Sequence, residues 1–307
     1  MPSLPISHLS RTNLADLNSF LVVATHKSFS KAAIELGIST SALSHSIKNL
    51  ESRLGVRLLN RTTRTVSITD AGQTLLNRLS KGFEEIGAAL TEINQHRDKP
   101  AGRLRINVLS DGARLLMSRS LPKYLALYPD MAVEVAVDDR MIDIIEAGFD
   151  AGIRYGGTIP EDLIASRLSD LLRWVAVASP KYLNKHPPIQ EPDDLKQHQC
   201  IQLRTGAGVI YRWDFAQHGK TCAVDVPGQL CVNETALGIE LALAGHGIMY
   251  CLEARVESYL SEGTLQVVLA DWAPLDQPFY LYYSGRRQIP PGLAELIETL
   301  RQDAESG

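Results

Sequence analysis

The stretch STSALSHSIKNLE, residues 39–51, decides how the rest of the chain is interpreted. Its apolar residues Leu43, Ile47 and Leu50 recur at the spacing of one helical face. Serine and threonine are indifferent helix formers because their hydroxyls compete for backbone hydrogen bonds, yet the segment is full of them. The pattern predicts a helix, capped by Ser39, with hydroxyl groups on its outer face.

The stripe opposite the apolar face consists of short or basic polar side chains. They can donate and accept hydrogen bonds, and they let a helix approach base edges and phosphates closely. A solvated polar face on an ordinary helical bundle is the alternative interpretation. The residues predicted to contact DNA from this helix are Ser39, Thr40, Ser41, Ser44, His45, Lys48 and Arg53.

Two more helices are predicted before this one, over residues 14–25 and 30–36. The second opens with Ser30 as its cap and ends at Gly37. Only a short turn separates it from the cap of the next helix. Two helices joined so closely are typical of a helix-turn-helix.

Residues 56–69 predict a short hairpin, or wing, because β-branched residues flank a polar tip. Arg61 and Arg64 at this tip suit contact with phosphates or the minor groove. Residues 27–64 hold seven basic and two acidic side chains, and the net charge is +4 over residues 1–99 and −8 over the remainder. The N-terminal part therefore presents an anion-binding surface.

Residues 70–97 contain no proline and predict one long helix of roughly 40 Å. Its apolar residues alternate at steps of three and four, the repeat that a coiled-coil partner requires. A symmetric DNA reader needs two recognition helices about one helical turn apart, which such a dimer would supply. The predicted dimerisation residues are Leu76, Leu79, Phe83, Ile86, Leu90 and Ile93.

Lys99 to Gly102 break this helix, and short apolar strands then alternate with amphipathic helices. This alternation predicts an α/β fold with mostly parallel sheets in two lobes. The predicted strands are 104–109, 133–137, 151–155, 173–178, 248–251, 265–269 and 280–283. The predicted helices are 115–128, 141–147, 234–244, 252–260 and 293–303.

The run SFSKAAIELGISTSALSHSIKNLESRLGVRLLNRTTRTVSITDAG, residues 28–72, resembles the N-terminal signature of LysR-type transcriptional regulators. The resemblance implies a winged helix-turn-helix domain (1–69), a linker helix for dimerisation (70–99) and a two-lobed effector-binding domain (103–307) like type 2 periplasmic binding proteins. Many members assemble as tetramers. Thr40 stands where many members carry Gln, so the expected base contacts rest mainly on Ser44, His45 and Lys48.

In two-lobed α/β domains, ligands bind between the lobes, near strand ends and helix N-termini. Two arginines beside hydroxyls suit a small carboxylate or another anion. The alternative is that Arg154 pairs structurally with Asp150 or another acid, and that Ser110 and Asn233 only cap helices. The predicted effector-binding residues are Ser110, Asp111, Arg154, Tyr155, Arg204, Asn233 and Thr235.

Other classes of function find little support in the sequence. It contains no GxSxG, HExxH, P-loop or complete GxGxxG motif, so neither catalysis nor a cofactor is expected. Four cysteines lie in the last third without a CxxC pair, so no metal site is expected, and Cys200 with Cys222 leaves only a weak case for a redox pair. The apolar run Phe20 to Ala24 is too short for a membrane span or a signal peptide.

These observations predict a cytoplasmic transcriptional regulator that is not an enzyme. Its expected partners are double-stranded DNA, a small-molecule effector, further copies of itself in a homodimer or tetramer, and RNA polymerase, but no membrane. The alternative is a solute-binding or enzymatic α/β protein whose N-terminal helices serve only for assembly. A constitutive DNA-architectural protein ranks last, because it leaves the two-lobed domain unexplained.

Overall fold

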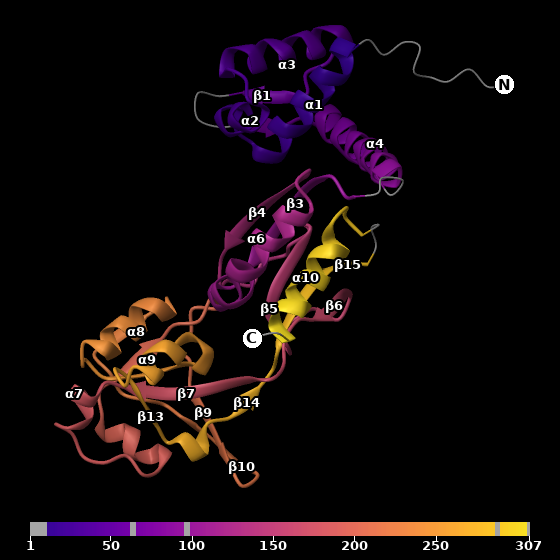
Figure 1. The fold of residues 1–307 in the computed structure, drawn as a ribbon. Coiled ribbons are helices and arrows are strands. Elements are labelled where there is room, and N and C mark those ends of the chain that lie inside the picture. Colours follow the sequence, from indigo (N-terminus) through magenta and orange to yellow (C-terminus); the bar gives the residue numbers. More distant parts are fainter. Residues whose placement is uncertain (1–10, 62–65, 95–98, 286–288, 306–307) are drawn as a thin grey trace. The chain divides into compact units, whose positions relative to one another are not determined.

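The computed structural model describes residues 11–61, 66–94, 99–285 and 289–305. The chain divides into two compact units, unit 1 over residues 1–93 and unit 2 over residues 94–307. Figure 1 shows the helices and strands of both, and each unit is described by itself. The division lies close to the predicted boundary at Lys99.

Unit 1 contains the predicted helix-turn-helix and hairpin. The strands β1 and β2 pair antiparallel, with Leu59 opposite Ile68 and Arg61 opposite Val66. The elements are α1 (Arg11–His26), α2 (Phe29–Leu36), α3 (Thr40–Leu54), β1 (Leu59–Arg61), β2 (Val66–Ile68) and α4 (Asp70–Asn94).

Local capping sets the ends of α2 and α3. Gly37 ends α2 in the left-handed region, at φ 65°, which glycine adopts without steric cost. The cap of α2 is Ser28, whose side chain accepts a hydrogen bond from the Lys31 amide, so the prediction of Ser30 was wrong by two residues. Ser39 caps α3 as predicted, accepting from the Ala42 amide at 3.1 Å.

The core of unit 1 forms where the three short helices meet. Phe20 and Val23 of α1 pack with Leu43 and Ile47 of α3, all fully buried. The small buried Ala32 of α2 lets this helix approach its neighbours closely. Removing a large side chain from such a core costs roughly 2–5 kcal/mol, so this packing holds the orientation of α3.

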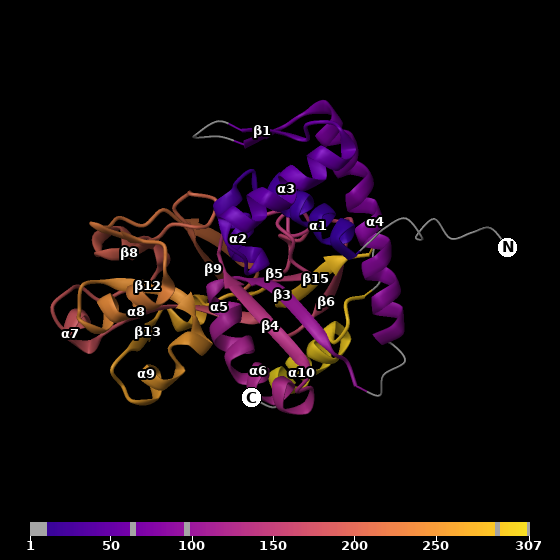
Figure 2. The same ribbon diagram turned by 90° about the horizontal axis from the view of Figure 1, so that it is seen from above.

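The first lobe of unit 2 is a five-stranded sheet in the order β4-β3-β5-β15-β6. Figures 1 and 2 show α6 and α10 side by side against this sheet. One helical run over residues 110–127 comprises α5, a π-turn η2 and α6. The elements are β3 (Gly102–Val108), α5 (Ser110–Gly112), η2 (Ala113–Met117), α6 (Ser118–Leu127), β4 (Met131–Val137), β5 (Ala151–Tyr155), β6 (Leu163–Arg167), β15 (Phe279–Ser284) and α10 (Leu293–Glu305).

The second lobe is built on a sheet with the strand order β11-β8-β12-β7-β13, and β9 and β10 form a separate hairpin. Its elements are β7 (Leu172–Ala178), α7 (Pro180–Leu183), η3 (Pro192–Gln197), β8 (Cys200–Leu203), β9 (Trp213–Gln217), β10 (Lys220–Val224), β11 (Leu230–Val232), α8 (Thr235–Leu243), β12 (Ile248–Leu252), η4 (Glu253–Arg255), α9 (Glu257–Ser261), β13 (Gln266–Val268), η5 (Ala270–Trp272) and β14 (Leu275–Asp276).

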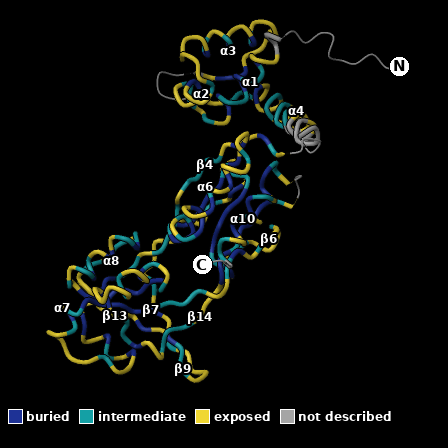
Figure 3. The backbone as a smooth tube through the Cα atoms, in the orientation of Figure 1, coloured by how far each residue is buried: buried dark blue, intermediate teal, exposed yellow. Residues whose placement is uncertain are grey.

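Strand β7 shows why both faces of the second sheet are covered. Val175 and Val177 belong to one apolar cluster, while Ala176 and Ala178 belong to another. Successive side chains point to opposite faces of a sheet, so a continuous apolar run indicates packing on both sides. Figure 3 shows buried backbone mainly along such strands, with exposed positions in loops and on outer helix faces.

Both sheets are mixed, so the prediction of mostly parallel sheets was wrong. In the first lobe, β3 runs parallel to β4 and β5, whereas β15 is antiparallel to β5 and β6. In the second lobe, β12 is parallel to β8 and antiparallel to β7. In the first lobe, the physical reason is that the chain leaves this lobe and returns to it much later with β15, which enters the sheet in the opposite direction.

The two segments that cross between the lobes pair with each other. The first leads from β6 into β7, and the second leads from β14 into β15. Leu275 lies opposite Arg173 and Asp276 opposite Leu172, in an antiparallel ladder. This pair of strands, the hinge ribbon, therefore joins the two lobes of unit 2.

The helix predicted over residues 141–147 is absent, and this segment forms turns. The Asp143 side chain accepts hydrogen bonds from the Ile145 and Glu146 amides at 2.9 and 3.0 Å. One helical bond, from the Ala147 amide to the Asp143 carbonyl, is formed, and Gly148 follows at φ 73°. Local side-chain bonds of this kind compete with helix propagation.

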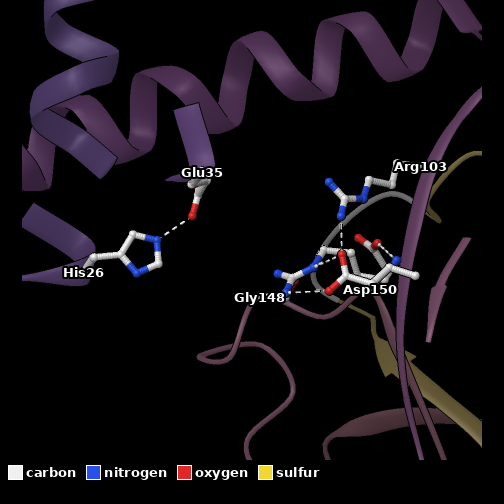
Figure 4. A network of polar contacts seen from close by, with 7 residues as sticks. His26, Glu35, Arg103, Gly148 and Asp150 are labelled. Carbon is white, nitrogen blue, oxygen red and sulfur yellow. Dashed lines mark hydrogen bonds and ion pairs between the residues drawn. The ribbon is translucent and has the colours of Figure 1, made fainter. Parts of the chain in front are cut away.

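Figure 4 shows polar contacts that tie neighbouring segments within each unit. In unit 1, His26 points toward Glu35 and joins the end of α1 to α2. In unit 2, the Arg105 amide donates to Asp150 at 2.7 Å and its guanidinium donates to the Gly148 carbonyl at 2.9 Å. Exposed ion pairs contribute little stability, about 0–1 kcal/mol, so the His26–Glu35 pair mainly fixes geometry. Among the helices of the described residues, none is long and apolar enough to cross a bilayer.

Candidate functional sites

The outer face of α3 is the first candidate site. Leu43, Ile47 and Leu50 are buried on the inner face of this helix. The predicted DNA-contacting residues Thr40, Ser41, His45 and Lys48 are exposed, and Ser44 is partly exposed. The structure thus separates the apolar and polar stripes of α3 in the way that the spacing predicts.

Hydrogen bonds within α3 order part of this polar face. The Ser39 hydroxyl lies 3.0 Å from that of Ser41, and the His45 Nδ1 lies 3.0 Å from the Asn49 side-chain nitrogen. These bonds already restrict the side-chain rotamers, so less side-chain conformational entropy is lost when this face contacts a ligand. The face is therefore partly pre-organised.

Arg53, also predicted to contact DNA, is bound within the fold. Its guanidinium pairs with the carboxylate of Asp16, which is buried on α1. The Ser46 hydroxyl donates to the same carboxylate at 2.5 Å. Arg53 and Ser46 therefore clamp α3 to α1, so Arg53 has a structural role that sequence reasoning missed.

The wing is fixed to the end of α3 by one carboxylate. Glu51 accepts hydrogen bonds from the Leu58 and Leu59 amides at 2.8 and 3.1 Å, where β1 begins. The backbone of Arg61 ends β1, while Arg64 lies outside the described residues. The hairpin is thus held at a defined place beside α3.

The predicted dimerisation residues on α4 occupy different surroundings. Leu76 and Leu79 pack against the core of unit 1, and Phe83 is partly buried. The side chain of Ile86 is 52% exposed. The side chains of Leu90 and Ile93 lie outside the described residues.

A cavity of about 360 Å³ in unit 2 is the second candidate site. Both lobes and the hinge ribbon contribute to its wall. All seven predicted effector-binding residues line it, namely Ser110, Asp111, Arg154, Tyr155, Arg204, Asn233 and Thr235. The volume is within the range of small-molecule sites, roughly 300–1,000 Å³.

Asp111 is partnered inside the protein. Its carboxylate forms an ion pair with Arg255, both side chains being only 6% exposed, and it accepts from the Tyr155 hydroxyl at 2.7 Å. Burial raises the pKa of Asp111, while Arg255 and Tyr155 oppose this shift. Because Asp111 lies in the first lobe and Arg255 in η4 after β12, the pair joins distant segments of unit 2.

Arg154 is also occupied by the fold. Its guanidinium donates to the Ile153 carbonyl at 2.7 Å and to the Asp138 and Arg140 carbonyls at 3.0 Å, and also to the Asn107 side chain. It therefore binds backbone oxygens, while Asp150 accepts from the Arg105 amide. Burial lowers the pKa of Arg154.

Further lining residues were missed by sequence reasoning. The aromatic side chains are those of Trp174 and Tyr211, and the carboxylates are those of Asp139 and Asp276. Gly206 lies so close to the first lobe that a Cβ there would be 1.9 Å from the Asp139 carbonyl oxygen. The one available signal was that Asp139 closely follows a predicted strand and that Trp174 lies near the start of another, whereas nothing local marks Tyr211 or Asp276.

The helix near Asn233 also differs in detail from the prediction. Glu234, and not Asn233, is the cap of α8, and its carboxylate accepts from the Ala236 and Leu237 amides at 3.0 and 2.8 Å. Ser110 begins the helical run of the first lobe, with its amide bonded to Asp139. Neither Ser110 nor Asn233 is a simple cap.

The four cysteines are free thiols in the described residues. Burial raises the pKa of Cys200 to about 12 and also raises the pKa of Cys251 and Cys222. A thiolate, not a thiol, reacts with oxidants, so the environment of Cys200 disfavours redox chemistry.

The fold and these two sites define a class of protein, a winged helix-turn-helix joined to a two-lobed α/β domain with a cavity between the lobes. Two family models agree with this class. The model of the bacterial regulatory helix-turn-helix protein, lysR family, matches residues 14–73. The model of the LysR substrate binding domain matches residues 97–305. The chain therefore belongs to the family of LysR-type transcriptional regulators.

Relatives and solved structures extend over the whole chain. A protein of Pseudomonas aeruginosa is 42% identical over 97% of both chains, and the uncharacterized HTH-type transcriptional regulator YcaN of Escherichia coli is 38% identical over 95% of both. The structure of CrgA, a LysR-type transcriptional regulator from Neisseria meningitidis, is 29% identical with a TM-score of 0.57, covering 95% of this chain and 98% of CrgA. The chain is thus a regulator with an effector-binding domain and not an enzyme.

Proposed function

We propose that this chain binds specific DNA sequences through α3 and the wing, and that a small molecule in the cavity of unit 2 controls this activity. The observation that carries the proposal is the outer face of α3, where His45 and Lys48 are exposed while Leu43 and Ile47 are buried. A polar face on a rigidly packed helix is suited to reading base edges in the major groove.

Ser44, His45 and Lys48 are the proposed readers of bases and phosphates. Arg61 and Arg64 of the wing would contact the phosphate backbone or the minor groove. Arg53 is left out of this set because Asp16 binds its guanidinium. Its role is to keep α3 at the angle at which the other side chains meet DNA.

The second part of the proposal concerns assembly. Two copies would pair through the exposed part of α4, where Ile86 is 52% exposed, and so present two copies of α3 to two half-sites. Leu76 and Leu79 contribute less to this dimer interface because they pack within unit 1. A dimer or tetramer acting on DNA in the cytoplasm, where it meets RNA polymerase, follows from this role.

The cavity would act as the switch because it is built from both lobes. Ser110 and Tyr155 contribute from the first lobe, Arg204 and Thr235 from the second, and the hinge ribbon passes beside them. A ligand that binds one arrangement of the lobes more tightly than another shifts the population toward it. Effector binding would thereby alter the spacing of the DNA-reading helices in the oligomer.

The decisive experiment measures DNA affinity of the full chain, using duplexes selected by it from a random-sequence pool. We expect enrichment of a two-half-site sequence, and log affinity should fall linearly with log salt because phosphates are neutralised. Replacing Arg61 and Arg64 with Ala should weaken binding, whereas Lys185→Ala in unit 2 is the matched control. No enriched sequence, or affinity independent of salt, would overturn the proposal.

A further inference from the structure

The chain's own carboxylates already occupy the helix N-termini beside the cavity. Asp139 accepts from the Ser110 amide at 2.7 Å and from the Ser110 hydroxyl at 2.9 Å. Glu234 binds the first amides of α8, directly after Asn233 in the cavity wall. Helix N-termini are the usual donors for an anionic ligand, so the bonded amides there are unavailable to one.

The arginines of the cavity wall offer little more to an anion. Arg154 is 3% exposed, and its two terminal nitrogens are bound to backbone oxygens and to Asn107. Its Nε has no hydrogen-bond partner among the described residues, but this atom is buried from solvent. Arg204 is exposed and donates one bond to the Gly208 carbonyl at 2.8 Å, so it retains donors for a ligand. The two-arginine anion site that the sequence predicts is therefore reduced to one guanidinium.

Two carboxylates of the wall, in contrast, keep acceptor capacity. An ionised carboxylate has about four lone-pair sites. Asp139 uses two of them for Ser110, and Asp276 accepts from the Gln277 amide at 2.7 Å. Both residues are exposed, Asp139 in the first lobe and Asp276 on the hinge ribbon.

Aromatic rings complete the wall. Trp174 stacks on Tyr211, with 6.0 Å between ring centroids and 28° between planes, and Tyr155 lies 5.8 Å from Trp174. All three residues are of intermediate exposure. An aromatic face attracts a cation within about 6 Å and also packs against a flat apolar group.

We propose that the effector is an organic cation, a protonated amine on a flat apolar body. Its ammonium would bind Asp139 and Asp276, and its body would lie against Trp174 and Tyr211. This inference rests on the proposed function, because it specifies the ligand class of the same cavity. Contacts to the first lobe, the second lobe and the hinge ribbon at once would favour one lobe arrangement.

The test compares three probes that share one phenyl ring and a short chain: 2-phenylethylamine, 3-phenylpropionate and L-phenylalanine. Each is titrated into the full chain by calorimetry and by thermal shift at the same concentration, since specific binding to the native state raises the melting temperature. We expect the amine to bind about tenfold more tightly than the carboxylate, with the amino acid between them because Arg204 can donate hydrogen bonds to its carboxylate.

Variants locate the binding. Asp276→Asn should weaken amine binding about tenfold, the typical effect of losing one charge-assisted contact. Asp139→Asn should do the same, and the melting temperature of the free variant is checked because Asp139 also binds Ser110. The control is Asp271→Asn, an exposed carboxylate of η5 outside the cavity wall.

Tighter binding of the carboxylate, no response to the amine, or an unchanged affinity in Asp276→Asn would each overturn the inference. The outcome is separable from the proposed function. If the chain selects a DNA sequence but binds the carboxylate more tightly than the amine, the proposed regulatory function stands and the proposed cation site is wrong. If the chain binds the amine through Asp276 but selects no DNA sequence, the proposed cation site stands and the proposed regulatory function is wrong.

Discussion

The outer face of α3 and the cavity wall of unit 2 are both polar surfaces beside an apolar core, yet they use their polar groups differently. On α3, His45 and Lys48 remain exposed. In the cavity wall, Asp111 and Arg154 are buried and bonded to the protein. A polar residue predicted at a site is therefore available to a ligand only where distant segments do not claim it first.

The largest effect is expected from replacing Arg255, the buried ion-pair partner of Asp111. Changing Arg255→Ala should lower the free energy of unfolding of unit 2 by about 3–5 kcal/mol, because the buried carboxylate of Asp111 loses its partner. Chemical unfolding of the full chain measures this.

The matched control is Arg212→Ala, which removes an exposed ion pair with Asp225. A loss below about 1 kcal/mol is expected there. Adding Asp111→Asn to Arg255→Ala should restore part of the stability. Similar losses in both single variants would contradict the view that burial makes the Asp111 pair structural.

The next effect concerns the approach of the lobes at Gly206. The Cβ of Gly206→Ala would lie 1.9 Å from the Asp139 carbonyl oxygen and 2.6 Å from the Arg140 nitrogen, so the backbone must shift. We expect a loss of about 1–3 kcal/mol, typical of overpacking, in the urea unfolding of the full chain.

Gly208→Ala provides the comparison, because Gly208 has open space around its Cβ position and a φ of 82°. It should lose about 1 kcal/mol through backbone strain alone. Ligand affinity should fall in Gly206→Ala and stay unchanged in Gly208→Ala. The reverse order would show that the lobes are not held together at Gly206.

A smaller effect is expected on α3. Lys48→Ala should weaken DNA binding a few-fold for all sequences and reduce the salt slope by about 1, with an unchanged melting temperature because Lys48 is exposed. Arg53→Ala should lower the melting temperature instead, because it removes the ion-pair partner of buried Asp16. Fluorescence anisotropy across salt concentrations separates the two, and Lys185→Ala is the control.

The smallest effect is a pH dependence on the β3–β4 edge. The hydrogen bond from Arg105, together with Arg103, holds the pKa of Glu134 below its usual value. A lowered carboxyl pKa contributes stability that is present above the unfolded pKa and is lost as pH falls through the folded value. Glu134→Gln should therefore flatten the acid side of the stability curve slightly, and exposed Glu161→Gln is the control.

Much of unit 1 could be predicted from the sequence. The spacing of Leu43, Ile47 and Leu50 predicted the inner face of α3. Gly37 and Ser39 predicted where the turn between α2 and α3 begins and ends. These signals act within a few residues, where periodicity and capping are reliable. The role of Arg53 was missed because its partner Asp16 lies on another helix.

Less of unit 2 could be predicted. The seven predicted strands exist, but the short strands β6, β8, β9, β10, β11 and β14 were missed, and the segment 141–147 is a turn because of the Asp143 side chain. The seven predicted cavity residues do line one cavity. Whether these residues are available to a ligand could not be predicted, because Asp139 and Arg255, which bind Ser110 and Asp111, come from other segments.

The sequence by itself determined the three short helices and the hairpin of unit 1, the cap and two faces of α3, and the strand ends where a cavity forms. These follow from repeats and caps that act over one or two turns of chain. Only the tertiary structure decided the mixed sheets, the hinge ribbon and which charges remain for a ligand. The reason is physical: Asp111 and Arg255 are 144 residues apart, and burial makes one neutralise the other.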